Sequence, residues 1–110
     1  MKRDFQMIKL VAECESSGKP YLEFLHSEAL SVGIYVLPAG GVDRQQPHTE
    51  DEVYHVISGR AILQVEDEQY AVEPGSVVFV QAGLNHRFTE ITEELTVLVF
   101  FAPAEYSRAT

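Results

Sequence analysis

Two histidines stand in segments of the chain where their spacing suggests metal binding. Gln46, His48 and Glu52 follow one another closely, and His86 lies in a second segment further along. Side chains alternate between the two faces of an extended strand, so Gln46 and His48 are expected to point the same way. Imidazole nitrogens and carboxylate oxygens are ligands of divalent transition metals. These two segments are therefore where the sequence suggests metal ligation.

Strand alternation adds further candidates beside these residues. Glu52 begins an apolar run and can point inward together with Tyr54. In the second segment, His86, Phe88 and Glu90 are expected to line one face of a strand. Glu90 could then act as a general base near the metal, or form a salt bridge at the rim.

Several aromatic residues are candidates to line a pocket, although each would equally suit core packing. They are Tyr35, Tyr54, Phe79 and Phe88. Glu50 and Asp51 are expected to form a solvated acidic loop rather than to act as ligands. The tail, residues 104–110, is expected to be frayed.

Short strands are expected to position these side chains. Runs of β-branched and aromatic residues, broken by Gly and Pro, are typical of an all-β sandwich or barrel. A short helix is expected only near the N-terminus, at residues 4–15, where apolar residues recur with a period near 3.6. The expected strands are residues 21–25, 30–37, 53–57, 61–65, 69–72, 77–80, 86–89 and 95–101.

Glycines fix the spacing of the first segment from both ends. Five residues separate Gly40 from Gln46, one separates Gln46 from His48, three separate His48 from Glu52, and six separate Glu52 from Gly59. This pattern resembles the first signature motif of the cupin family. That motif is a glycine, five residues, His-x-His, three or four residues, Glu, six residues and a glycine. Gln46 stands where the motif has its first histidine.

The second segment resembles the second cupin motif, which is a glycine, five residues, Pro-x-Gly, two residues, His, three residues and Asn. Read from Gly75, it reaches Gln81, Gly83, His86 and Glu90. Glutamine and glutamate replace the proline and the asparagine of the motif. The two motifs together cover roughly residues 31–102, the core of what we expect to be a single domain over residues 1–110.

The resemblance implies a double-stranded β-helix (a jelly-roll barrel) and a metal held by His48, Glu52 and His86. Two imidazoles and a carboxylate suit iron(II), and the same set suits manganese, nickel, cobalt or zinc. Gln46 could coordinate through its amide oxygen, or it could lie behind the ligands and orient a bound water. The residues leave both roles open.

The resemblance also indicates two classes of function. One is a metal-dependent enzyme acting on a small organic molecule, with a dioxygenase ahead of a lyase or an isomerase. The other is a non-catalytic module that binds a small molecule or metal, as a sensor or storage protein. A homodimer is expected, because outward apolar residues such as Val53 and Ile57 need cover.

Composition excludes other classes of partner. The formal net charge of the 110 residues is −9, which disfavours binding to nucleic acid or to an anionic membrane surface. The sequence has no apolar run long enough to span a bilayer and no secretory signal pattern, so a cytoplasmic location is expected. Its one cysteine, Cys14, cannot form an internal disulfide and is expected to be an ordinary thiol.

Overall fold

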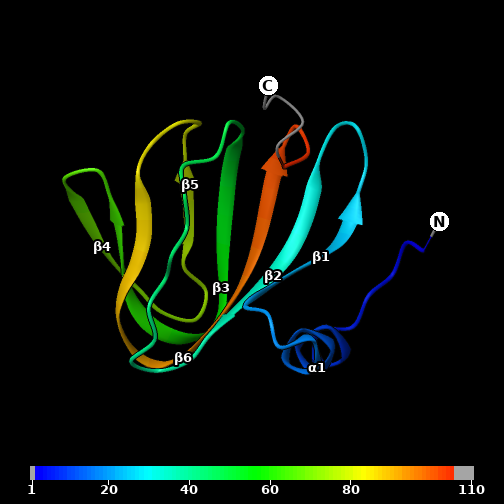
Figure 1. Ribbon diagram of the computed structural model, residues 1–110, viewed down its shortest axis with the longest axis horizontal. Helices are drawn as coiled ribbons and strands as arrows, with labels where there is room; N and C mark the ends of the chain where they lie inside the picture. Colours follow the sequence, from blue (N-terminus) through cyan, green and yellow to red (C-terminus); the bar gives the residue numbers. More distant parts are fainter. Residues whose placement is uncertain (1, 106–110) are drawn as a thin grey trace.

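The computed structural model describes residues 2–105, which form one helix and six strands (Figure 1). The fold is therefore all-β apart from the N-terminal helix, as the sequence predicts. In chain order the elements are α1 (Met7–Ser17), β1 (Tyr21–His26), β2 (Ser31–Leu37), β3 (Asp51–Val65), β4 (Glu68–Val72), β5 (Val77–Val80) and β6 (His86–Ala102).

Two long antiparallel strands, β3 and β6, form the centre of the fold. They pair from Asp51 opposite Ala102 to Val65 opposite His86, with register shifts between Val56 and Ile62. The sequence predicts four separate strands in these ranges, and the structure joins them into two. The shifts bend the strands instead of ending them, because an irregular register increases local twist and curvature.

Gly59 lies within the bent part of β3 and has a φ of +95°. A side chain there would be strained, and its Cβ would overlap the backbone carbonyl oxygen of Glu94 on β6. Glycine allows both the unusual dihedral angle and the close approach of the two strands. The bend that brings both ends of β3 to the upper end of the barrel depends on this residue (Figure 1).

The strands lie in the order β1-β2-β6-β3-β4, and β5 pairs with the other edge of the first part of β3. The curled sheet encloses a core of alternating inward side chains. Along β3, for example, Glu52, Tyr54 and Val56 are buried while the residues between them are partly exposed. The core consists of Tyr35, Leu37, Tyr54, Val56, Ala61, Leu63, Val72, Val80, Phe88, Ile91, Leu95, Val97, Val99 and Phe101.

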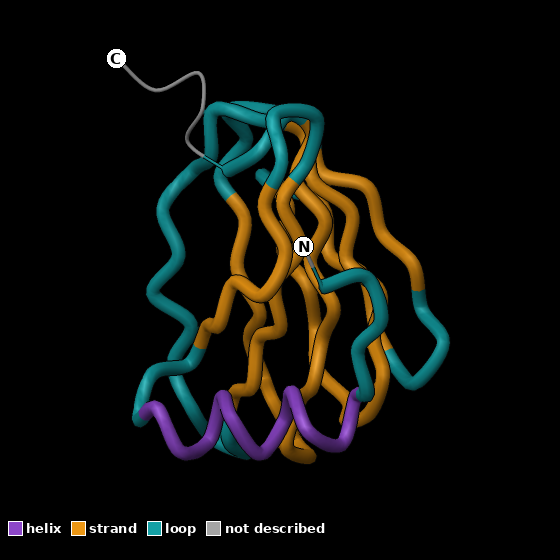
Figure 2. The backbone as a smooth tube through the Cα atoms, turned by 90° about the vertical axis from the view of Figure 1, so that its right-hand side faces the viewer, coloured by secondary structure: helices purple, strands orange, loops and turns teal. Residues whose placement is uncertain are grey.

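Helix α1 covers the outer face of β2 at the lower end of the barrel (Figure 2). Leu10 and Cys14 of the helix pack with Ile34 of β2, and all three are buried. The helix ends at Gly18 in the left-handed conformation, with φ of 73°. Burial raises the pKa of the Cys14 thiol, with a smaller contribution from Glu15, which agrees with an ordinary thiol. Across residues 2–105, no helix has the length and apolar character to cross a membrane.

Candidate metal centre

The three residues of the cluster come from different elements that meet at the upper end of the barrel. His48 lies in the loop between β2 and β3, Glu52 lies near the start of β3, and His86 is the first residue of β6. Because both long strands turn back at the lower end, their starts lie at the same end of the molecule (Figure 1). The bend thus brings together Glu52 and His86, which are 34 positions apart in the sequence.

The donor atoms of His48, Glu52 and His86 all lie within 4.8 Å of one another. Oε1 of Glu52 lies 2.7 Å from Nε2 of His86 and 3.4 Å from Nδ1 of His48. The exposed fractions are 7% for His48, 2% for Glu52 and 6% for His86, so all three side chains are buried. The buried carboxylate sits between two imidazoles, an arrangement that concentrates donors around one point.

Each imidazole has a second acceptor on its far side. Nδ1 of His86 lies 2.9 Å from the carbonyl oxygen of Leu84, to which an N–H there donates. Nε2 of His48 lies 3.0 Å from Oε2 of Glu105. Metal-binding histidines usually donate their other N–H to a carboxylate or a backbone carbonyl, which fixes the tautomer. Both rings therefore have the outer partner that a metal ligand needs.

The inner atoms of the cluster fit a divalent metal ion. Within residues 2–105, Oε2 of Glu52 is buried without a hydrogen-bond partner, and Nε2 of His86 has the 2.7 Å contact with Oε1 of Glu52 but no hydrogen bond of normal geometry. Buried polar atoms are rarely left in that state unless an ion or water satisfies them. Two nitrogens and a carboxylate are also the ligand chemistry of iron, manganese, cobalt, nickel and zinc sites. The residues present thus agree with the group that the motif implies.

The electrostatics of the metal-free cluster favour a protonated histidine beside a charged carboxylate. Burial alone would lower the pKa of His48, but hydrogen bonds to the Glu105 and Glu52 carboxylates raise it from 6.5 to about 9. Burial likewise opposes the charge on Glu52, yet His48 and His86 hold its pKa below the usual 4.5. Glu52 also raises the pKa of His86 against the effect of burial. A metal entering this cluster must therefore displace protons.

The metal-free protein is expected to lose stability as the pH rises from 6.5 to about 9. The folded-state pKa of His48 lies above its unfolded value, so its contribution is full below pH 6.5 and disappears as the pH rises through the folded value. Urea unfolding with a chelator present, at several pH values in this range, measures the effect. The His48→Gln variant should show a flatter profile, and an unfolding midpoint that rises over this range in the wild-type protein would contradict the expectation.

Asp43 anchors the loop that carries His48. This carboxylate is 5% exposed and accepts hydrogen bonds from the Tyr35 hydroxyl (2.8 Å) and the backbone N–H of Phe88 (2.8 Å). It also accepts from the backbone N–H of Gln45 (3.2 Å) and from its side-chain Nε2 (2.6 Å). The Tyr54 hydroxyl in turn donates to Oε1 of Gln45 at 2.8 Å. The loop is thus tied to β2, β3 and β6.

The family comparison spans the three cluster residues and the loop that carries His48. Residues 33–102 match the family model described as a cupin domain, which is more than half of the chain. The chain belongs to the cupin family. Members of this family bind small-molecule ligands, and many bind a metal.

Similar proteins agree with this assignment. An uncharacterized protein from Streptomyces coelicolor is 48% identical over 101 residues, covering 92% of this chain and 96% of the relative. A conserved Klebsiella pneumoniae protein with a double-stranded β-helix domain has the same fold, with a TM-score of 0.79, 20% identity and coverage of 94% and 91% of the two chains. The DMSP lyase DddQ from Ruegeria pomeroyi has a TM-score of 0.65 and 25% identity, covering 69% of this cupin and 39% of the lyase.

A cavity of about 240 Å³ opens beside His48. Its walls are formed by the loop before β3 and by the inner face of β2 and β6. The lining residues are Tyr21, Tyr35, Arg44, Gln45, Gln46, His48, Val99, Phe101 and Glu105. A second cavity of about 290 Å³ lies on the side of His86 and is more polar, lined by Gln45, Gln64, Glu66, Asn85, His86 and Arg87. A larger cavity of about 550 Å³, between the N-terminal segment and β1, contains none of the three cluster residues.

The structure places the two glutamines of the loop differently from the expectation. Gln46 was expected to share a strand face with His48, but residues 41–48 form a loop without regular strand structure. Gln46 is exposed and borders the cavity beside His48, whereas its neighbour Gln45 is half-buried and bonded to Asp43 and Tyr54. The amide fixed within the site is therefore that of Gln45, which sequence reasoning missed because the strand alternation does not hold here.

Glu90 does not share the face of His86 and Phe88 as expected. His86 and Phe88 are buried, but Glu90 is exposed, and Ile91 is buried after it. Glu90 has a φ of 48°, in the left-handed region, which breaks the alternation of the strand. The strand alternation from which a general base at Glu90 was expected therefore does not hold.

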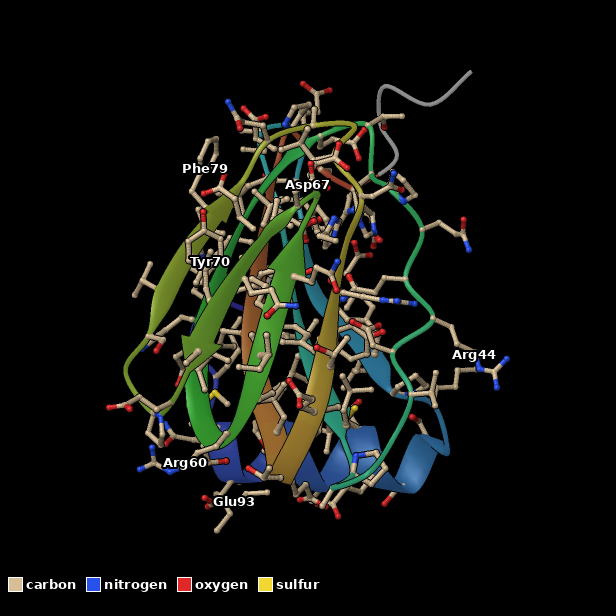
Figure 3. The ribbon with its side chains drawn as sticks, turned by 90° about the vertical axis from the view of Figure 1, so that its left-hand side faces the viewer. Arg44, Arg60, Asp67, Tyr70, Phe79 and Glu93 are labelled. Carbon is tan, nitrogen blue, oxygen red and sulfur yellow. The ribbon has the colours of Figure 1, made fainter. Side chains whose placement is uncertain are left out.

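The aromatic candidates divide between cavity and core. Tyr35 lines the cavity beside His48, while Tyr54 and Phe88 pack against each other with ring centroids 5.0 Å apart. The Tyr54 ring also packs beside the His86 ring, with centroids 6.0 Å apart. Phe79 was wrongly placed at the pocket: it is 57% exposed and points away from the barrel (Figure 3).

The expected solvated loop of Glu50 and Asp51 is only half correct. Glu50 is only 1% exposed and accepts a hydrogen bond from Thr49, whereas Asp51 beside it is exposed as expected. Ala104 is fully buried and Glu105 reaches His48, so fraying is wrong for these two residues. Residues 106–110 lie outside the described part of the chain.

Proposed function

We propose that this cupin is a metal-dependent enzyme that acts on a small organic molecule, with His48, Glu52 and His86 as the metal ligands. The observation that carries the proposal is the convergence of three buried donors within 4.8 Å of one another beside a cavity. A purely structural metal site is usually closed by four protein ligands, whereas a catalytic site keeps positions open. Three protein ligands leave such positions.

A divalent ion held by these side chains would polarise substrate oxygens and, as iron(II), would support oxygen chemistry. The chain's own residues would shape the rest of the reaction site. Tyr35, Val99 and Phe101 form apolar walls beside His48 that exclude water and fit an apolar substrate body. The buried Tyr35 hydroxyl remains a proton donor, because burial and the Asp43 carboxylate raise its pKa.

A dioxygenase is the reaction class that we place first. Two histidines and one carboxylate form the ligand type of non-haem iron(II) oxygenases. The structural likeness to the DMSP lyase DddQ supports a lyase as the second candidate, because that enzyme shares the barrel. Fold likeness alone does not transfer an activity, so the ligand set decides the order.

The test is an oxygen-electrode assay of the iron(II)-loaded protein with a panel of small catechols, diketones and thiols. Oxygen consumption that depends on one substrate class and is lost in the His48→Ala variant is the expected result. Conversion without oxygen uptake, also lost in His48→Ala, would favour the lyase. If the loaded protein binds panel members without converting any under air or argon, the non-catalytic binding module is the better description.

We also propose that two copies associate through an apolar row on the outer face of the barrel. Phe79, Val53 and Phe100 lie opposite one another on β5, β3 and β6, and Phe79 and Phe100 are 57% and 39% exposed. Figure 3 shows Phe79 on this outer surface. Large apolar side chains exposed together commonly mark an interface.

Sedimentation at micromolar concentration is expected to give twice the chain mass of 12.3 kDa. The Phe79→Glu variant should sediment as a monomer, because it places a charge within the row. A wild-type protein that sediments at the mass of one chain would contradict this proposal.

A further inference from the structure

The end of the described chain reaches the metal cluster through Glu105. Ala104 is fully buried, and the backbone N–H of Glu105 donates to Oγ of Ser31 at 2.8 Å. Ser31 is itself 0% exposed. From this anchored backbone, Oε2 of Glu105 lies 3.0 Å from Nε2 of His48. A segment distant in sequence from both motifs thus places a carboxylate against a cluster residue.

We propose that Glu105 is a positioning residue that fixes the tautomer and orientation of His48; this inference rests on the proposed metal site. An N–H at Nε2 of His48 donates to Glu105, so the proton resides at Nε2. When a metal displaces the proton of Nδ1, which lies 3.4 Å from Oε1 of Glu52, the lone pair of that nitrogen is directed into the cluster. A carboxylate behind a ligating imidazole also makes that nitrogen a better donor.

His86 shows the same arrangement with a different partner. Its Nδ1 faces the carbonyl oxygen of Leu84, which leaves Nε2 directed at Glu52. This partner is local, because Leu84 lies only two residues before His86 in the chain. His48 has a carboxylate from the far end of the chain in the equivalent role.

The position of His48 on a loop explains why it needs this partner. Residues 38–50 contain no strand, and the loop is held at Asp43 and by the backbone of His48, whose carbonyl accepts from the N–H of Gly83 at 2.8 Å. These contacts hold the backbone, while the imidazole packs against the Phe101 ring, with centroids 4.6 Å apart, and faces Glu105 with its outward nitrogen. Glu105 supplies a side-chain contact to the outward nitrogen of His48.

The experiment compares cobalt(II) affinity, by titration of the metal-free full-length chain, in the wild type and in the Glu105→Ala and Glu105→Gln variants. Glu105→Ala is expected to weaken cobalt binding by about 10- to 100-fold, the usual cost of losing such an outer partner. Glu105→Gln should lose less, because its amide oxygen still accepts from Nε2. Glu13→Ala, which removes an exposed glutamate on α1, is the matched control and should bind as the wild type does.

Nitrogen-15 spectra of the histidines in the zinc-loaded protein distinguish a positioning role of Glu105 from a merely structural one. The proposal predicts a proton on Nε2 of His48, with a shift that changes in Glu105→Ala while the His86 signals stay in place. Wild-type affinity in both Glu105 variants, with affinity lost in His48→Ala, would overturn the role of Glu105 and leave the metal site standing. An Nε2 without a proton would overturn it too. Unchanged binding in His48→Ala as well would remove the metal site itself.

Discussion

Replacing Glu52 with glutamine is expected to remove most of the metal affinity of this cupin. Glu52 is the anionic member of the three-residue cluster, and its Oε1 lies between the two imidazoles at 2.7 and 3.4 Å. Glutamine has the same shape but carries no charge, and its amide group is a weaker donor to a transition metal. The loss should exceed the roughly 10- to 100-fold that an outer partner costs. Competition titration with zinc and a chromophoric chelator measures it.

The control for this variant is Glu66→Gln, which makes the same change at an exposed residue bordering the second cavity. It should bind zinc as tightly as the wild-type protein. The metal-free Glu52→Gln protein should remain folded, since the substitution retains the volume of a buried side chain. Equal zinc affinities for the Glu52 and Glu66 variants would show that the cluster is not the binding site.

Replacing Asp43 with alanine is expected to destabilise the protein strongly. Asp43 is 5% exposed and satisfies the hydroxyl of Tyr35 and the backbone N–H of Phe88, both buried residues. Each buried donor left without an acceptor costs about 1–3 kcal/mol, so the two together cost about 2–6 kcal/mol. That is a large fraction of the roughly 5–15 kcal/mol by which most domains are stable. Urea unfolding of the metal-free protein measures the change.

Asp51→Ala provides the matched control for this prediction. Asp51 also accepts a hydrogen bond from a distant backbone, the N–H of Ala82 at 2.9 Å, but its side chain is exposed. Water can replace it there, and the expected loss is only about 0.5–1.5 kcal/mol. If Asp43→Ala costs no more than Asp51→Ala, the buried network does not hold the loop that carries His48.

Glycines and alternating apolar residues made much of the fold predictable. The intervals from Gly40 to Gly59 and from Gly75 to Gly83 fix the register of both motifs, and strand residues 77–80 agree with the structure residue for residue. The joining of shorter predicted strands into β3 and β6 was not predictable. Bulged strands and separate strands carry the same local turn signals, and only the pairing partner distinguishes them.

The cluster was predictable where the backbone is regular and not where it is irregular. Alternation correctly gave the inward face of Glu52, Tyr54 and Val56 along β3. It gave the wrong side for Gln46, which lies in a loop, and for Glu90, whose backbone is in the left-handed region. A single change in backbone conformation turns the following side chains to the opposite face of a strand.

Glu105 had no local sequence signal at all. It follows the last strand and resembles a solvated terminal acid, and its role depends on contacts with Ser31 and His48, which lie more than fifty positions away. Gln45 was missed for a related reason, since its partner Asp43 is buried by β2 and β6. Contacts of this kind follow from tertiary structure, which strand periodicity does not encode.

The most direct test of the metal centre is elemental mass spectrometry of the tag-free protein alongside the His86→Ala variant. We expect close to one equivalent of a transition metal per wild-type chain and almost none in the variant, because His86 is one of the three proposed ligands. Iron in the wild-type protein would direct activity screens toward oxygen chemistry. A wild-type protein that takes up no metal even after reconstitution, or a variant that retains the full equivalent, would contradict this expectation.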